Sequence, residues 1–170
     1  MNNSSAFESP PLLSTVERSG QQESQHHGHV VIVKADRIER CWGDPETPVF
    51  PRSAIKPLQA LPLIERGIAD RLELSDRELA LTSASHNGTD EHVEVVRGLL
   101  AKGGFSDEDL RCGPHAPFDS AASLAIAKAG ARPGVIHNNC SGKHAGFLLL
   151  ARDLGDEAES YLDPDSAAQR

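Results

Sequence analysis

The sequence of 170 residues lacks long hydrophobic runs, which argues against a membrane-spanning helix. Its longest apolar run, Phe147 to Ala151, is far shorter than the roughly 20 residues that cross a bilayer. The first thirty residues also lack a basic segment followed by an apolar one, so the sequence predicts no secretory signal. We therefore expect no membrane partner.

Positive charge and cysteine are also scarce. Seventeen Lys and Arg stand against twenty-five Asp and Glu, a formal net charge of -8, and no stretch is uniformly basic. Binding to nucleic acid through phosphate neutralisation is therefore not expected. The three cysteines are odd in number and widely spaced, which is typical of a reducing cytoplasm. A hydrophobic content of 38% is enough for a core, so the sequence predicts an acidic, cytoplasmic, globular protein.

The N-terminal third of the chain reads as a leader followed by strands. Residues 1–11 are polar and end in Pro-Pro, which predicts a disordered leader before a single domain over residues 12–170. The β-branched residues 29–33 predict a strand paired in a hairpin with residues 38–42. The histidines at 26, 27 and 29 predict a polar loop, with metal binding as the alternative. A brief buried strand is expected at residues 135 and 136.

The rest of the chain has helical periodicity and end signals. Ser75 and Glu78 form a capping box, Gly67 is a natural stop, and Pro62 should kink or end its helix early. Residues 163–170 resemble a cap and a first helical turn, from which we expect that the chain is the front portion of a longer protein. The expected helices cover residues 53–65, 76–81, 90–102, 119–128 and 143–154.

Ser53-Ala54-Ile55-Lys56 is the sharpest chemical pattern. Residues three apart share one face of a helix, so the Lys56 amine could reach the Ser53 hydroxyl and act as its general base. Ser-x-x-Lys is the nucleophile motif of β-lactamases and penicillin-binding proteins. The spacing also occurs by chance in many proteins. A helix start at Ser53 would add backbone N–H groups that favour an anionic substrate.

Two further segments carry reactive side chains. The small polar residues from Ser83 to Gly88 either bring hydroxyls to a pocket or form an ordinary turn. Cys140 and His144 are four residues apart at a predicted helix start, a spacing that suits a metal, a thiolate nucleophile or a packed buried cysteine. One such pair does not complete a zinc site, which needs four ligands.

Taken in order, these segments resemble the bacterial and fungal L-asparaginase II family, of the rhizobial, thermolabile type. Any one motif is weak, whereas the ordered set is specific and spans about residues 12–170. The matching segments are Val16–Gly20 with Glu23, Ser24, His26 and Gly28, then Pro51–Gln59, Ala84–His86, Arg111–His115 and Asn139–Gly146.

The resemblance implies a fold of the α+β class, a sandwich of helices and antiparallel sheet like that of serine β-lactamases and penicillin-binding proteins, incomplete in this chain. It implies hydrolysis of L-asparagine to L-aspartate and ammonia. Ser53 with Lys56 would be one Ser–Lys tandem, and Ser85 the first half of a second, whose lysine would lie beyond residue 170. The implied substrate-binding residues are Arg52, His86 and His144.

The resemblance also bears on cofactors and partners. It implies that Cys140 and Lys143 are ligands of a zinc ion near the pocket, although the Ser–Lys chemistry itself requires no cofactor. The expected partners are a small-molecule substrate and, at full length, a second copy in a homodimer. Two alternatives stay open: a β-lactamase-like or penicillin-binding-like serine hydrolase that uses Ser53 and Lys56, and an inactive fragment.

Overall fold

The computed structural model describes residues 10–170, which fall into two compact units. The first unit ends at Phe50 and the second runs Pro51–Arg170. Almost all of the leader predicted at residues 1–11 lies outside the described residues. The single domain expected over residues 12–170 stays a prediction.

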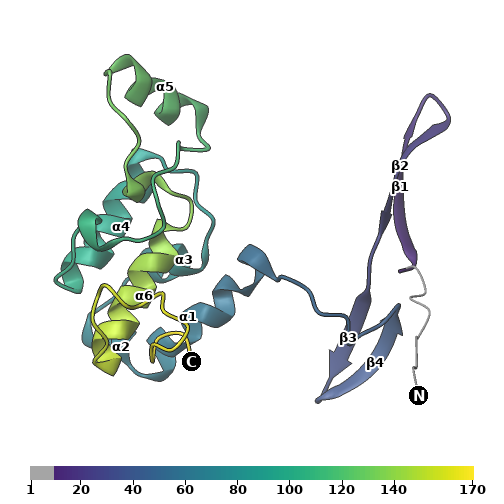
Figure 1. The fold of residues 1–170 in the computed structure, drawn as a ribbon, viewed down its shortest axis with the longest axis horizontal. Coiled ribbons are helices and arrows are strands. Elements are labelled where there is room, and N and C mark those ends of the chain that lie inside the picture. The colour runs from purple at the N-terminus through teal and green to yellow at the C-terminus, as the bar shows by residue number, and fades with distance from the viewer. Residues whose placement is uncertain (1–9) are drawn as a thin grey trace. The chain divides into compact units, whose positions relative to one another are not determined.

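The first unit consists of two antiparallel hairpins (Figure 1). Strand β1 (Leu12–Arg18) pairs with β2 (Gln21–His27), and β3 (Val30–Lys34) pairs with β4 (Arg37–Trp42). The predicted hairpin of β3 and β4 is confirmed. The polar loop predicted around the histidines is wrong, because His26 and His27 lie in β2.

Turn geometry explains why the β1–β2 hairpin forms without a hydrophobic pattern. Both residues of its connection, Ser19 and Gly20, have positive φ angles of 51° and 76°. Ala35 and Asp36, between β3 and β4, have φ angles of 47° and 60°. Two consecutive residues with positive φ form the turn whose twist matches paired strands. Backbone hydrogen bonds to β1 therefore hold the polar strand β2. Its sequence has no alternation of polar and apolar residues that would predict a strand.

The second unit is helical (Figure 1). No helix within residues 10–170 is long and apolar enough to cross a membrane. With the hairpins of the first unit, these helices make the chain α+β, as predicted at that level. The helices are η1 (Arg52–Ile55), α1 (Lys56–Glu65), α2 (Ile68–Arg71), α3 (Asp76–Ser83), α4 (Asp90–Lys102), η2 (Asp107–Asp109), α5 (Ser120–Lys128), η3 (Val135–His137) and α6 (Ser141–Leu154).

Helix α6 forms the centre of this unit. It contacts α1, α3 and α4 (Figure 1). Its residues are buried from Ser141 to Ala151 except for Lys143. An apolar surface on all sides is what a fully surrounded helix requires. Helix α4 presents the predicted face to the core, formed by Val93, Val96, Leu99 and Leu100.

Two local predictions are wrong, and a third is wrong in part. Helix α1 does not end early at Pro62 but continues to Glu65, and its outer side is exposed at Leu58 and Leu61, where water can satisfy a carbonyl that lacks its donor. Ile136 is buried, as predicted, and Val135 is half-buried. The two residues form the 3-10 helix η3 instead of the predicted strand. Residues 163–170 form turns and no helix.

Candidate active site

Lys56 and Ser85 are the reactive pair that the structure brings together. The Lys56 ammonium lies 2.9 Å from Ser85 Oγ and 2.8 Å from the Ala84 carbonyl oxygen. Lys56 is buried at 2% exposure, and no carboxylate of residues 10–170 forms an ion pair with it. The pair therefore has the contact that a serine nucleophile and its base need.

Local backbone structure accounts for this contact. Lys56 is the first residue of α1, while α3 ends at Ser83 and the chain becomes extended at Ala84, where ψ is 161°. The extended backbone turns the Ala84 carbonyl and the Ser85 hydroxyl toward the Lys56 side chain, which enters from α1. Ser85 is exposed, so a substrate can reach it.

Ser53 and Arg52 lie in η1, immediately before α1. Both are exposed, and within residues 10–170 neither side chain has a hydrogen bond or ion pair. Arg52 has a φ of 48°, a backbone conformation that side chains other than glycine rarely adopt and that is often found at functional sites. The structure thus pairs Lys56 with Ser85, whereas the helical spacing had predicted a pair with Ser53.

His86 is buried beside Ser85 and has protein partners at both ring nitrogens. Nδ1 accepts the Gly88 N–H at 3.2 Å, and Nε2 lies 2.8 Å from Ser141 Oγ. Burial, with smaller effects from the nearby cations His92, Lys56 and His137, lowers the pKa of His86 to about 4. His86 is therefore neutral at pH 7. Its predicted role in substrate binding stays a prediction.

His144 lies on α6 and contacts Tyr161, a residue that the sequence did not single out. Its Nδ1 is 2.8 Å from the Tyr161 hydroxyl, which accepts the Arg111 N–H, also at 2.8 Å. Burial, followed by Lys143 and Lys56, lowers the pKa of His144 to about 4. Burial raises the pKa of Tyr161 to about 12. Both groups are neutral at pH 7.

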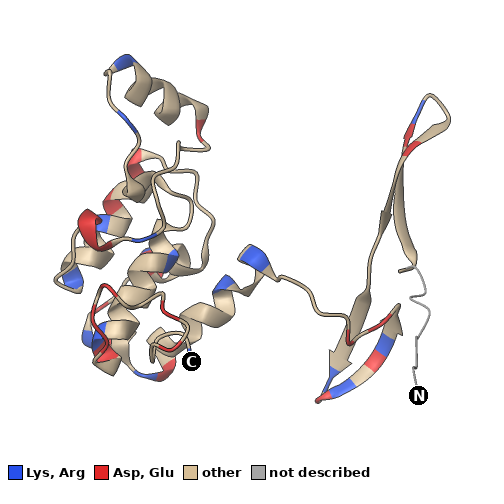
Figure 2. Ribbon diagram, viewed as in Figure 1, with Lys and Arg blue, Asp and Glu red and all other residues tan. Residues whose placement is uncertain are grey.

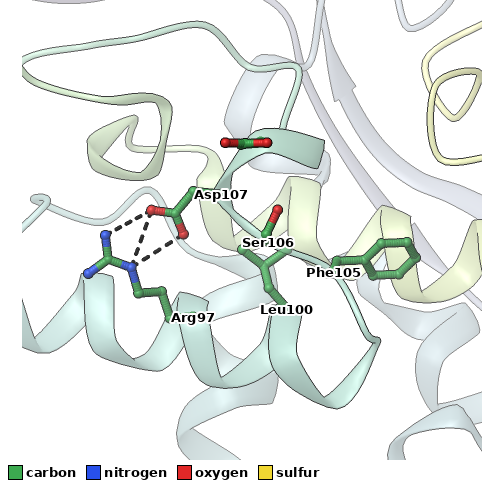
Figure 3. Close-up of a pocket in the computed structure, with 6 residues that line it drawn as sticks. Arg97, Leu100, Phe105, Ser106 and Asp107 are labelled. Carbon is green, nitrogen blue, oxygen red and sulfur yellow. Dashed lines mark hydrogen bonds and ion pairs between the residues drawn. The ribbon is translucent and has the colours of Figure 1, made fainter.

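Two cavities lie on the second unit. The larger, of about 550 Å³, is lined by α4 and η2, and the ion pair of Arg97 with Asp107 forms one of its walls (Figure 3). The smaller, of about 250 Å³, includes Ala84 in its lining and so lies next to Ser85. Volume alone would select the larger cavity, but of the two only the smaller has a sequence neighbour of Ser85, Ala84, in its lining.

The comparison with protein families decides the class of this protein. A sequence model described as L-asparaginase II matches residues 14–170, which is most of the chain. The chain belongs to the L-asparaginase II family. No curated protein matches it. The resemblance drawn from the ordered motifs is confirmed, and so is the broad class, an amidohydrolase of the asparaginase type with a small-molecule substrate.

Acidic residues are absent from the segments that carry this L-asparaginase II site. Although the net charge is -8, residues 51–64, 79–89, 110–118 and 120–152 contain no Asp or Glu. Figure 2 shows the acidic residues on other segments, such as η2 and the chain after α6. The acidic residue that lines the cavity beside Ala84, Glu91, is paired with Arg77, so the charge near the site that has no ion-pair partner within residues 10–170 comes from Lys56 and Lys143 and favours an anionic group such as a substrate carboxylate.

The predicted zinc ligands of the L-asparaginase II motif lie at the start of α6. The N–H of Cys140 donates to Asn138 Oδ1 at 2.8 Å, and the Lys143 amine lies 5.4 Å from the centre of the Phe147 ring. Within residues 10–170, no three His, Cys, Asp or Glu side chains gather around a point that could hold a metal. Burial raises the pKa of the nearby Cys112 thiol to about 11, which disfavours the thiolate that zinc binds. The described residues therefore do not fit a closed zinc site.

Proposed function

We propose that this member of the L-asparaginase II family hydrolyses L-asparagine to L-aspartate and ammonia, with Ser85 as nucleophile and Lys56 as its base. The contact of 2.9 Å between Lys56 Nζ and Ser85 Oγ is the observation that carries the proposal. The sequence pattern favoured Ser53 for this role. Ser85 is the better candidate because it, and not Ser53, lies within hydrogen-bonding distance of the buried amine.

The hydrogen bonds of Lys56 suit this chemistry. When neutral, the amine can donate one N–H to the Ala84 carbonyl at 2.8 Å and accept the Ser85 hydroxyl proton, 2.9 Å away, with its lone pair. Ser85 Oγ attacks the side-chain amide carbon of the substrate as its proton passes to Lys56. Lys56 then gives that proton to the departing nitrogen. Ammonia leaves, and the acyl group of the substrate stays bound to Ser85 as an ester, the acyl-enzyme. A water molecule, losing one proton to Lys56, attacks the ester carbon. Lys56 returns that proton to Ser85 Oγ as aspartate leaves, which restores both groups.

Two side chains, those of Arg52 and His144, would orient the substrate. We propose that Arg52 binds the α-carboxylate of asparagine, because a guanidinium offers two parallel N–H groups to a carboxylate. Its exposure and the absence of a protein partner within residues 10–170 leave those groups available. His144 would supply a neutral hydrogen bond to the substrate.

The proposal extends to the cofactor, the localisation, the fold and the oligomeric state of the enzyme. Catalysis by Lys56 and Ser85 requires no cofactor, and zinc would bind to Cys140 and Lys143 only weakly. We propose a cytoplasmic enzyme with a fold related to that of serine β-lactamases, acting as a homodimer. The Ser53-x-x-Lys56 spacing at the start of α1 supports the relation to β-lactamases.

Ammonia release from L-asparagine tests the proposal, with the variants Ser85→Ala, Lys56→Met and Ser53→Ala. We expect the first two to lose turnover by a factor on the order of 10⁴ or more, as other hydrolases do without nucleophile or base. Ser83→Ala is the matched control, because that hydroxyl bonds only to the Ala80 carbonyl within its own helix.

Two results would contradict the assignment. Near-normal turnover by Ser85→Ala, together with loss of turnover in Ser53→Ala, would show that Ser53 and not Ser85 is the nucleophile. Hydrolysis of the β-lactam nitrocefin without ammonia release from asparagine would favour a β-lactamase-like enzyme instead.

A further inference from the structure

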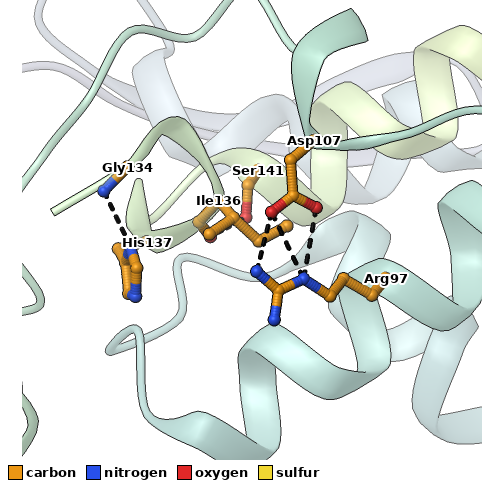
Figure 4. A network of polar contacts seen from close by, with 6 residues as sticks. All are labelled: Arg97, Asp107, Gly134, Ile136, His137 and Ser141. Carbon is orange, nitrogen blue, oxygen red and sulfur yellow. Dashed lines mark hydrogen bonds and ion pairs between the residues drawn. The ribbon is translucent and has the colours of Figure 1, made fainter.

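A buried chain of hydrogen bonds joins the residue after Ser85 to the first residue of α6. His86 and Ser141 are 3% and 0% exposed, and their side chains meet at 2.8 Å between Nε2 and Oγ. Ser141 Oγ in turn donates to the Ile136 carbonyl at 2.8 Å. Figure 4 shows Ile136 beside Ser141, on the side that faces the ion pair of Arg97 and Asp107. Fifty-five residues of sequence separate the two ends of the His86–Ser141 bond.

The direction of every bond in this chain follows from its donors. The Gly88 N–H can only donate, so His86 Nδ1 accepts and its ring proton must be on Nε2. Nε2–H therefore donates to Ser141 Oγ, whose own hydrogen goes to Ile136. No member of the chain has a hydrogen left over. The opposite tautomer would set a ring N–H against the Gly88 N–H and leave Nε2 without a hydrogen.

The residues at the start of α6 also hold the backbone of His86. The His86 N–H donates to the Asn139 carbonyl at 3.1 Å, so residues 139 and 141 both bind His86. His92 stacks on the His86 ring, with centroids 5.3 Å apart, from the opposite helix α4. The residue that follows Ser85 is thus fixed at its backbone, at both ring nitrogens and on one ring face.

We propose that Ser141 is a positioning residue for Ser85: by accepting the His86 Nε2–H it holds the His86 ring in the orientation in which Nδ1 accepts the Gly88 N–H, and so holds Ser85 against Lys56. The proposal rests on the proposed function in that it takes Ser85 as the nucleophile. Ser141 itself does not touch the substrate. Without its oxygen, the His86 ring loses its buried acceptor and can rotate or change tautomer, and the backbone at Ser85 moves with it.

Two measurements on the whole chain test this role. Nitrogen-15 spectra of the imidazole rings report the tautomer of His86, assigned by its loss in His86→Asn. Sulfonylation by phenylmethylsulfonyl fluoride, with the modified residue located by mass spectrometry, reports the reactivity of Ser85 without requiring asparaginase turnover. The variants are Ser141→Ala and Ser141→Cys, the latter in case the alanine variant does not fold, with Ser83→Ala as the matched control.

We expect a proton on Nε2 alone in the wild type and in Ser83→Ala, and a mixture of tautomers in the Ser141 variants. The sulfonylation rate at Ser85 should fall by about 100-fold in folded Ser141 variants, the cost of a displacement near 1 Å, and stay within about twofold in Ser83→Ala. A proton on Nδ1 in the wild type, or unchanged reactivity in both Ser141 variants, overturns the proposal. A chain that reacts in this Ser141-dependent way but releases no ammonia keeps the positioning role and refutes the proposed function.

Discussion

Replacing Gly142 with alanine would place a methyl group against the backbone of a neighbouring helix. A Cβ at this position of α6 would lie 2.4 Å from the Leu81 carbonyl oxygen and 3.0 Å from its carbon, at the end of α3. Backbone atoms cannot rotate aside as a side chain does, so the two helices must separate. Overpacking of this kind costs about 1–3 kcal/mol.

The matched substitution is Gly146→Ala, one turn further along the same helix. Its Cβ would lie 3.3 Å from side-chain atoms of Leu63 and Thr82, which can shift by a few tenths of an ångström. Alanine is also favoured over glycine in a helix by about 1 kcal/mol, and this gain applies to both variants. We therefore expect Gly142→Ala to lose up to about 2 kcal/mol, which is the cost of overpacking less the helical gain, and Gly146→Ala to be at least as stable as the wild type to within about 1 kcal/mol.

Urea unfolding followed by far-ultraviolet circular dichroism measures both losses. The Leu81 carbonyl accepts the Ala84 N–H at 3.2 Å, so a displacement in Gly142→Ala should also reach Ser85 and slow its sulfonylation. If the two variants were equally stable, or if Gly142→Ala matched the wild type, the close approach of α3 and α6 would not constrain this site as argued.

Two other predictions concern protons and metal. Because the pKa of His86 falls from its ordinary value of 6.5 to about 4 in the folded protein, its stabilising effect is complete above pH 6.5 and is lost as the pH falls toward 4, by up to about 3 kcal/mol. Unfolding by urea between pH 7.5 and 4.5 should therefore be less pH-dependent in His86→Gln, and an equal dependence would contradict the assignment. Zinc should bind the chain with micromolar or weaker affinity in competition with a chromophoric chelator, because Cys140 and Lys143 supply two of four ligands. A tight stoichiometric site would show that other side chains complete it.

Local signals in the sequence predicted most of the helices. The capping box of Ser75 and Glu78 is present at the start of α3, with the Ser75 N–H donating to Glu78 at 2.7 Å, and Thr89 caps α4. These signals act within one helical turn, so a sequence pattern can carry them. Strand β2 was missed because its residues are polar, and η3 because a short buried run suits either a strand or a single helical turn.

The active site was predicted only in its components. Ser53, Lys56 and Ser85 were all identified, yet the partner of Lys56 is Ser85, 29 residues away, on the extended segment after α3. A spacing of three reveals only neighbours on one helix, where Ser53 is exposed while Lys56 turns into the protein. Ser141 and Tyr161 carried no local signal, because a serine at a helix start and a single tyrosine are ordinary features.

The sequence alone therefore determined the family, the broad enzyme class and the helix boundaries set by capping residues, and it offered candidates for the reactive side chains, since each depends on neighbours in the chain or on ordered motifs. Only the tertiary structure decided which serine meets the lysine, that His86 and His144 are neutral at pH 7 and what holds these rings. Those properties arise where α1, α3 and α6 pack together. There Gly142 allows two backbones to approach, and burial removes the water that would otherwise satisfy Lys56, His86 and Ser141.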